Sequence, residues 1–370
     1  MPGPDPTPVA GAEAYTRRDR DARLSQAAIV LSLGAAAAGQ PERVDRPDAV
    51  GLPTDLAPLG QREPVPLEEA VAPLGITVDE QRSRSGPAVP SDTRGALMDQ
   101  VVADPNPTNA AALVEACLHS GDRLVRTAAA VSALDTTGPR DDVVAQLVDG
   151  ATRGRDMAKD IGRLGLARVD PAHPALRRVV VRTTPPDAGD RPSHTAFLTH
   201  GTFAALTAWW RPGGDFYTYL DGLTPPLHVH DPSFQWSGQY SDGARRLAAQ
   251  QMLDWVASQG LQRPDLFAHS HGGTVANLAT GLGLDLDRLV LLSWPVHEEW
   301  FPDFTRVGRI IDIRVNLDLV ILADRGGQTF TPPASAAGKV TSHVNGWFAH
   351  SDTHDPDYWN RWGLPATLNP

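Results

Sequence analysis

The stretch Leu266-Phe267-Ala268-His269-Ser270-His271-Gly272-Gly273-Thr274-Val275 decides the fold. A short apolar run meets a polar apex at Ser270, and apolar residues with helical spacing follow it. This order predicts a strand, a sharp turn and a helix. Small residues on both sides of such a turn let the strand and the helix approach each other, and Ala268 and Gly272 occupy these two places. The stretch is therefore the G-x-S-x-G pattern of a nucleophile elbow, with alanine in the first position.

Strand-like runs alternate with helical patterns on both sides of this elbow. These runs are almost continuously apolar, as strands that are buried on both faces of a parallel sheet must be. Besides the elbow strand, we expect strands at 178–182, 196–199, 227–230, 288–293 and 309–315, a strand that ends near Phe348, and a helix at 242–259. The alternation predicts an α/β fold, in which helices sandwich a mostly parallel sheet.

The charge and the cysteine content limit the classes of partner and compartment. The 370 residues carry a net charge of −11, whereas a nucleic-acid partner requires a basic surface, so we expect no such partner. Cys117 is the single cysteine, which excludes an internal disulfide and fits a reducing compartment. No apolar run is as long as a membrane span, which takes about 20 residues.

An alanine-rich run at 27–39 is the one candidate for an export signal. It follows several arginines, but a secretory signal begins with a short basic segment, and here about 25 residues precede the run. These residues include Asp19 and Asp21. We therefore expect a cytoplasmic location, with export as the alternative.

Composition divides the rest of the chain. Residues 1–94 are broken by prolines and charges, and we expect an irregular, partly disordered extension with short helices at 13–38 and 67–74. Residues 95–172 are rich in alanine and have helical spacing, which predicts an α-helical region. Residues 173–370 hold the strand–helix alternation.

An internal similarity runs through the helical region. Leu113–Cys117 aligns with Leu147–Ala151 thirty-four positions later, and the run Val125–Ala129 resembles the second helix of a HEAT repeat. Helix pairs of this kind stack because neither helix can bury its apolar face alone. A small helical bundle is the alternative. Either arrangement would give the chain a surface for a protein partner.

A serine nucleophile needs a base, an acid that orients the base, and donors for the oxyanion. On a sheet of this type the order along the chain is serine, acid, histidine. Asp318 follows the strand that ends at Val315 and is the expected acid, with Asp324 as the alternative. His350 begins the loop after the last predicted strand and is the expected base, with His354 as the alternative.

The oxyanion donors would come from two turns. The backbone amide of His271 is one donor, and the amide of Thr202 or Phe203 is the other, because the turn His200-Gly201-Thr202 follows an apolar strand directly. The residues that we expect around the substrate are mostly aromatic or flank these turns, namely His200, Gly201, Trp209, Trp210 and His269.

The turn His200-Gly201-Thr202, the segments Trp236-Ser237-Gly238 and Ala268–Gly272, Asp318 and the His350 loop together resemble the α/β-hydrolase family, on its lipase/esterase side. The resemblance covers roughly residues 176–365, and it implies that 173–370 form an α/β-hydrolase catalytic domain. It implies Ser270 as nucleophile, Asp318 as acid and His350 as base, which act through an acyl-enzyme that water resolves. The implied substrate is a small-molecule or lipid ester, and no cofactor is implied.

Two other functions fit parts of the sequence. The pairs His228-x-His230 and His269-x-His271 would suit a zinc-dependent hydrolase, although the H-x-H-x-D-H pattern would need Asp and His where Gly273 and Thr274 stand. The second alternative is a non-catalytic binding protein on a hydrolase scaffold, with the helical region as its working surface.

Overall fold

The structure is a computed structural model, and it describes residues 10–38, 91–104, 106–176, 195–223 and 227–369. The predicted helix at 67–74 and the predicted strand at 178–182 lie outside the described residues. The chain forms two compact units, a helical unit that extends to Ala158 and an α/β unit that begins at Lys159. Within the described residues, no helix is both long and apolar enough to cross a membrane.

The helical unit is built from alanine-rich helices. Its elements are α1 (Ala10–Ala37), α3 (Ser91–Ala103), α4 (Pro107–Leu118), α5 (Arg123–Thr136) and α6 (Asp141–Arg153), and α7 (Asp156–Val169) crosses into the α/β unit. Asp122 caps α5, because its side chain accepts a hydrogen bond from the amide of Val125 at 3.1 Å. The resemblance to HEAT repeats remains a prediction.

Helix α1 belongs to the core of the helical unit. The expected helix at 13–38 is present, but its second half is buried, with Ile29, Leu31 and Leu33 at most 2% exposed. The hydroxyl of Ser132 in α5 donates a hydrogen bond to the carbonyl of Val30 at 2.7 Å. We expected this helix to belong to an irregular, partly disordered extension, whereas its small alanine side chains allow it to pack closely on α5.

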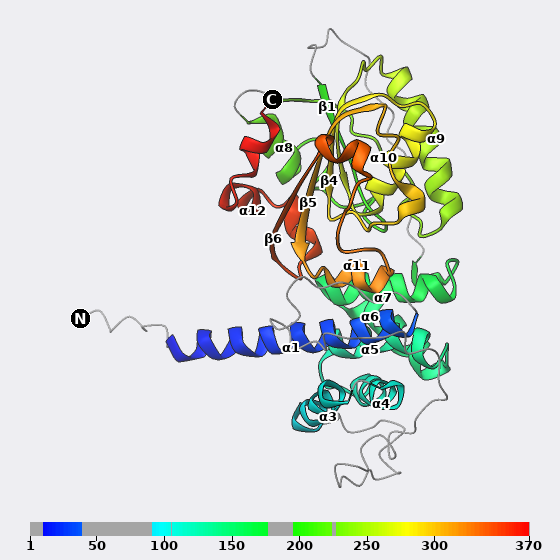
Figure 1. Cartoon of the computed structure of the whole chain (residues 1–370), viewed down its shortest axis with the longest axis vertical. Coiled ribbons are helices and arrows are strands. Elements are labelled where there is room, and N and C mark those ends of the chain that lie inside the picture. Colours follow the sequence, from blue (N-terminus) through cyan, green and yellow to red (C-terminus); the bar gives the residue numbers. More distant parts are fainter. Residues whose placement is uncertain (1–9, 39–90, 105, 177–194, 224–226, 370) are drawn as a thin grey trace, which may run out of the picture. The chain divides into compact units, whose positions relative to one another are not determined.

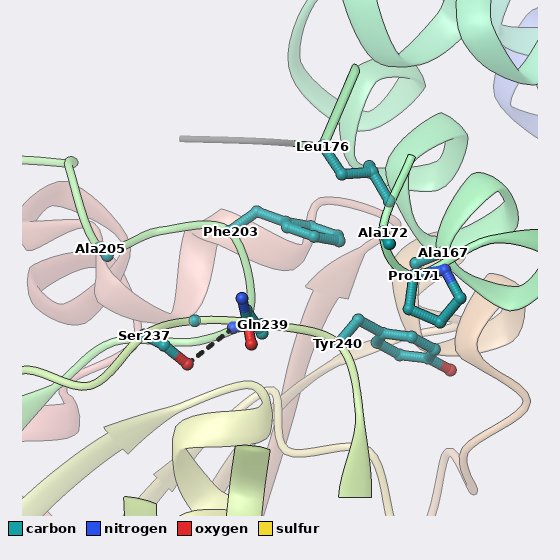
Figure 2. Close-up of a pocket in the computed structure, with 10 residues that line it drawn as sticks. Ala167, Pro171, Ala172, Leu176, Phe203, Ala205, Ser237, Gln239 and Tyr240 are labelled. Carbon is teal, nitrogen blue, oxygen red and sulfur yellow. Dashed lines mark hydrogen bonds between the residues drawn. The ribbon is translucent and has the colours of Figure 1, made fainter. Parts of the chain in front are cut away.

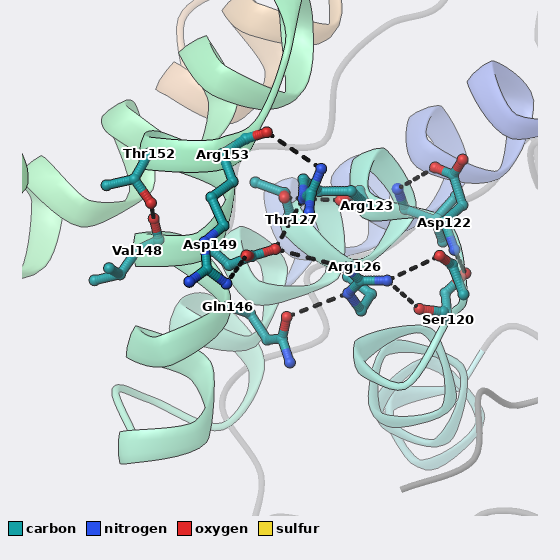
Figure 3. A network of polar contacts seen from close by, with 12 residues as sticks. Ser120, Asp122, Arg123, Arg126, Thr127, Gln146, Val148, Asp149, Thr152 and Arg153 are labelled. Atoms are coloured by element: carbon teal, nitrogen blue, oxygen red, sulfur yellow. Dashed lines mark hydrogen bonds and ion pairs between the residues drawn. The ribbon is translucent and has the colours of Figure 1, made fainter. Parts of the chain in front are cut away.

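Ion pairs join α5 to α6 on the outside of this unit (Figure 3). Asp149 in α6 accepts a hydrogen bond from Nε of Arg123 at 2.9 Å and lies 3.6 Å from a guanidinium nitrogen of Arg126. Arg126 also donates to the carbonyl of Ser120 at 2.7 Å. Partly exposed pairs contribute little each, about 0–1 kcal/mol, so their main effect is to fix how the two helices meet.

The α/β unit contains a six-stranded parallel sheet in the order β2-β1-β3-β4-β5-β6. The strands are β1 (Thr195–Thr199), β2 (His228–Val229), β3 (Asp265–His269), β4 (Leu286–Leu292), β5 (Val307–Asn316) and β6 (Val340–Trp347). The helices are α8 (Asp215–Asp221), α9 (Asp242–Ser258), α10 (His271–Gly281), α11 (Leu319–Asp324) and α12 (Pro356–Arg361). Short 3-10 turns are η4 (Pro174–Leu176), η5 (Glu298–Trp300), η6 (Ala334–Lys339), η7 (His350–His354) and η8 (Leu364–Leu368). The expected architecture, a parallel sheet with helices on both faces, is confirmed.

Alternate residues of each strand enter two separate cores. Leu266 and Ala268 of β3 pack with α9 and α10, whereas Phe267 points to the opposite face and packs with Phe216 of α8 and Trp359 of α12. Figure 1 shows these helices on the two sides of the sheet. Because both faces are covered, the inner strands β1, β3 and β4 are largely apolar, whereas the edge strand β6 is polar and partly exposed.

The strand order reverses at β1 and β3. From β1 the chain goes outward to β2 at the edge and then returns to β3 on the other side of β1. The residues at the carboxyl ends of β1 and β3 are paired, Thr199 with Ala268. In open parallel sheets a ligand crevice forms at such a switch point. The loops that begin at His200 and Ser270 leave the sheet there.

Candidate active site

Ser270 lies at a strained turn between β3 and α10. Its φ is 53° and its ψ is −133°, a left-handed conformation that side chains rarely adopt, at a cost of about 1–3 kcal/mol. The turn is held by the amide of Ser270, which donates to the carbonyl of Leu292 in β4 at 2.8 Å. Such strain persists only where the surrounding structure over-determines it, and it is often found at functional sites.

The loop after β1 presses directly against this turn. A Cβ atom on Gly201 would lie 2.6 Å from Cβ of Ser270, and one on Gly272 would lie 2.6 Å from the carbonyl oxygen of His200. Glycine is therefore required at both positions by close approach. The close approach of the His200 carbonyl thus explains why the elbow pattern requires a small residue at position 272.

We expect Gly272→Ala to lower the free energy of unfolding by about 1–3 kcal/mol, because the new methyl group would overlap a backbone carbonyl that has no room to move. Gly281→Ala in the same helix is the matched control, since nothing lies within 4 Å of a Cβ there. In the control, the free energy of unfolding should stay unchanged or rise by up to about 1 kcal/mol. Urea unfolding of both variants measures the difference. Equal effects would contradict the close approach.

Asp318 and His350 lie in contact at the same end of the sheet. Asp318 follows β5, and His350 follows β6 at the start of η7. Nδ1 of His350 lies 2.7 Å from Oδ2 of Asp318, and both side chains are buried. The other oxygen, Oδ1, accepts hydrogen bonds from the amides of Val320 and Ile321 at 3.0 and 3.2 Å. One carboxylate thus caps α11 and binds the imidazole at once.

The alternative acid, Asp324, is engaged elsewhere. Its Oδ1 lies 2.9 Å from Nε2 of His271, and its Oδ2 lies 3.3 Å from Nε2 of His297. Burial opposes its charge, but the two imidazoles outweigh burial and hold the pKa of Asp324 well below its ordinary value. Burial lowers the pKa of His271 to about 4, so its ring is neutral near pH 7. Its Nδ1 lies 3.2 Å from the hydroxyl of Thr274.

The alternative base, His354, is part of an aromatic stack. Its ring lies 4.1 Å from the Trp209 ring between centroids, with the two planes within 5°. It also meets His269 edge-on at 4.7 Å. Burial lowers the pKa of His354 to about 4. No hydrogen bond between His354 and a carboxylate is found among the described residues. Unlike His350, His354 therefore has no acid among these residues that orients its ring.

The electrostatics of His350 are set by two opposing effects. Burial disfavours its protonated form, but the charge of Asp318 and the hydrogen bond to it outweigh burial, and the pKa of His350 is raised above its ordinary value of 6.5. Since only the neutral imidazole accepts a proton, catalysis by His350 is expected to disappear as the pH falls through this raised value.

We therefore expect the acidic limb of the kcat/KM profile to have an apparent pKa above 6.5. Initial rates on a p-nitrophenyl ester between pH 4 and 9 measure the limb. A limb close to pH 4 would instead match the lowered pKa of His354, and it would contradict His350 as the base.

The expected oxyanion donors differ in whether their backbone amides already donate a hydrogen bond. His271 is the first residue of α10, so its amide has no acceptor within the helix. The amide of Phe203 donates to the carbonyl of Gly238 at 2.9 Å. Of the two candidates for the second donor, Thr202 is therefore the better one, because its amide is not committed in this way.

The residues expected around the substrate form a packed wall. His200, Trp209, Trp210 and His269 are all buried. The ring of His200 lies between those of Trp210 and Trp236, at 4.7 and 5.7 Å between centroids, and burial lowers its pKa to about 4. Stacked rings fill space efficiently, so these side chains support the turn after β1.

A pocket of about 400 Å³ opens beside this wall instead (Figure 2). None of the five residues expected around the substrate lines it. Its lining comes from α7 and the segment that follows, and from the loops after β1 and β2, namely Ala167, Pro171, Ala172, Leu176, Phe203, Ala205, Ser237, Gly238, Gln239 and Tyr240. Ser237 and Gly238 were noted in the sequence as part of the resemblance. Nothing in the strand pattern pointed to Leu176.

The two His-x-His pairs do not converge. His228 is exposed, and Nε2 of His230 lies 3.1 Å from Oε1 of Gln259. His269 lies 3.2 Å from the carbonyl of His350, whereas His271 binds Asp324. Across the described part of the chain, no three His, Cys, Asp or Glu side chains are grouped to hold a metal ion. The residues present therefore do not fit the zinc site of the alternative function.

No protein-family model matches the sequence, and no curated protein matches it. Among solved structures, the chain is similar to a predicted CIB-like hydrolase from Thermoplasma acidophilum, with 13% identity and a TM-score of 0.33 over 47% of this chain and 86% of that one. It is also similar to a hormone-sensitive lipase from a metagenome library, with 13% identity and a TM-score of 0.34 over 60% of this chain and 97% of that one. Likenesses this slight carry no weight for function, which has to follow from the chain's own residues.

Proposed function

We propose that the chain is a serine hydrolase that cleaves a carboxylic ester through an acyl-enzyme on Ser270. The observation that carries this proposal is the 2.7 Å contact between His350 and Asp318. The strands β3, β5 and β6 are parallel, so the loops that hold Ser270, Asp318 and His350 leave the sheet at one end. A strained serine, a buried acid and an imidazole at one edge are the parts that acyl transfer requires.

The contact also supports the assignment of Nε2 of His350 as the base. A carboxylate only accepts hydrogen bonds, so Nδ1 of His350 carries the proton toward Asp318 and Nε2 is left unprotonated. Nε2 takes the proton of the Ser270 hydroxyl as the oxygen attacks the ester carbonyl. The amides of His271 and Thr202 stabilise the negative oxygen that forms.

In the proposed steps, every proton is accounted for as the acyl-enzyme forms and is hydrolysed. The tetrahedral intermediate collapses, the bond to the alcohol breaks, and His350 gives its proton to the departing oxygen. Water then enters, gives its proton to Nε2 of His350 and attacks the acyl carbon. The second intermediate releases the carboxylic acid, and the proton returns to Ser270. A small-molecule or lipid ester is the substrate class that this sequence of steps suits.

Hydrolysis of p-nitrophenyl acetate by the full chain, with and without a strong chelator, tests the proposal. We expect turnover that the chelator leaves unchanged, because every group in the proposed steps belongs to the chain itself. Loss of turnover in chelator, with recovery on added zinc, would favour the metal-dependent alternative. The absence of turnover on any ester would favour a binding protein on a hydrolase scaffold.

A further inference from the structure

Two residues that line the pocket of about 400 Å³, Phe203 and Tyr240, are neighbours of the residues that carry the proposed oxyanion donors. Phe203, in its wall, directly follows Thr202, and the amide of Phe203 is held by the carbonyl of Gly238, which also lines the pocket. On the other side, the ring of Tyr240 meets the ring of His271 edge-on at 5.7 Å. A substrate whose carbonyl oxygen rests on the two amides would therefore have one substituent at the mouth of this pocket.

The pocket does not extend to the base. His350 has His269 as a neighbour, at 4.6 Å between ring centroids, and His269 in turn meets Trp209 and His354. None of these four residues lines the pocket. His350 must reach the alcohol oxygen to give it a proton, so the alcohol departs on the side of His350. The acyl group is left with the other side, where the pocket lies.

The lining indicates the kind of acyl group. None of the ten lining residues carries a charge, and six are alanine, proline, leucine or phenylalanine. Burial and the nearby carboxylate of Asp324 raise the pKa of the Tyr240 hydroxyl, so this lining residue is uncharged as well. Two guanidinium groups lie near the lining but are not part of it: that of Arg163 lies over the ring of Phe203 at 5.8 Å, and that of Arg245 lies over the ring of Tyr240 at 4.9 Å. A charged substituent would lose its hydration here without a partner.

We propose, on the basis of the proposed ester hydrolysis, that this pocket binds the acyl group of the substrate and that the group is uncharged, largely apolar and much larger than acetyl. Its volume of about 400 Å³ lies within the usual range of small-molecule sites, about 300–1,000 Å³. The hydroxyl of Ser237 and the side chain of Gln239 are the polar groups at its wall, and they would suit a single uncharged polar substituent.

Filling the pocket from its rim tests this assignment. Ala172 is an exposed residue of the lining, so Ala172→Trp can occupy the pocket without disturbing a core. We expect the ratio of kcat/KM for p-nitrophenyl hexanoate to that for the acetate to fall at least about tenfold, because only the longer chain competes with the indole. Ala257→Trp is the matched control, since Ala257 is exposed on α9 and does not line the pocket. It should leave the ratio of the two esters unchanged.

A second series of substrates separates the acyl group from the alcohol. With the acetyl group fixed and the alcohol lengthened from ethyl to hexyl, Ala172→Trp should have no selective effect. A selective loss in this series, and not in the acyl series, would show that the pocket takes the alcohol and would overturn the assignment. The assignment would also be overturned if Ala172→Trp had no selective effect in either series while the hydrolysis still required Ser270. Hydrolysis that does not require Ser270 would instead contradict the proposed function itself.

Discussion

Replacement of Ser270 by alanine is expected to lower kcat on p-nitrophenyl esters by a factor on the order of 10⁶, because no other group can form the acyl-enzyme. The fold should survive, since the side chain shrinks by one oxygen and the amide that holds the turn, donated to Leu292, remains. Initial rates measure the loss, and the urea midpoint measures the stability.

Ser293→Ala is the matched control for this variant. Ser293 follows β4, as Ser270 follows β3, and it also has a left-handed φ, of 46°. Its amide donates to the carbonyl of Ile313 at 2.9 Å, much as that of Ser270 does to Leu292. We expect the control to keep its activity. A Ser270→Ala enzyme that retains more than a tenth of wild-type turnover, or a control that loses as much, would contradict the assignment of the nucleophile.

Replacement of His350 by alanine should have an effect of comparable size, on the order of 10⁶ in kcat, because the nucleophile and its base act as a unit. His354→Ala should cost less than about tenfold. Its ring stacks on Trp209 and so supports the loop that holds His350, but it takes no proton in the proposed steps. Rates of both variants are compared with the wild type at one pH on the plateau of the wild-type profile, above the acidic limb.

The two histidine variants also separate a chemical role from a structural one. If His354 only supports the loop, His354→Phe should restore most of the activity, because the phenyl ring can stack on Trp209. No such rescue is expected for His350→Phe. A larger loss in His354→Ala than in His350→Ala, without rescue by phenylalanine, would exchange the assignments of the two residues.

The sheet could be predicted because each strand is marked by residues that are adjacent in the sequence. Strands buried on both faces are apolar throughout, and the small residues around Ser270 mark the turn. The order of serine, acid and histidine then pointed to Asp318 and His350, which the structure brings to 2.7 Å. The order along the chain places these loops together because parallel strands deliver all three loops to one end of the sheet.

What the sequence did not reveal depends on contacts between distant residues. His354 lies one turn after His350, and the two are distinguished only by their partners in the fold: His350 contacts Asp318, whereas His354 stacks on Trp209. Asp324 looked like a second acid until His271 and His297 were found on its oxygens. Packing of this kind follows from the fold, and spacing along the chain carries no sign of it.

The pocket and the burial of α1 also depend on contacts between residues that are far apart in the sequence. Trp209 and Trp210 were expected around the substrate, but both are buried in the core. The wall of the pocket comes instead from Leu176 and its neighbours, which precede the first described strand. The burial of α1 depends on α5, about a hundred residues later, as the hydrogen bond from Ser132 to Val30 illustrates.

Covalent labelling by a fluorophosphonate tests most directly whether the hydroxyl of Ser270 is an activated nucleophile. The reagent reacts with serines whose proton a neighbouring base removes, and it leaves a stable phosphonyl group on the oxygen. We predict a single label, which peptide mass spectrometry locates on Ser270, and no labelling after His350→Ala. A wild-type protein that stays unlabelled, or a label on any other residue, would contradict the account.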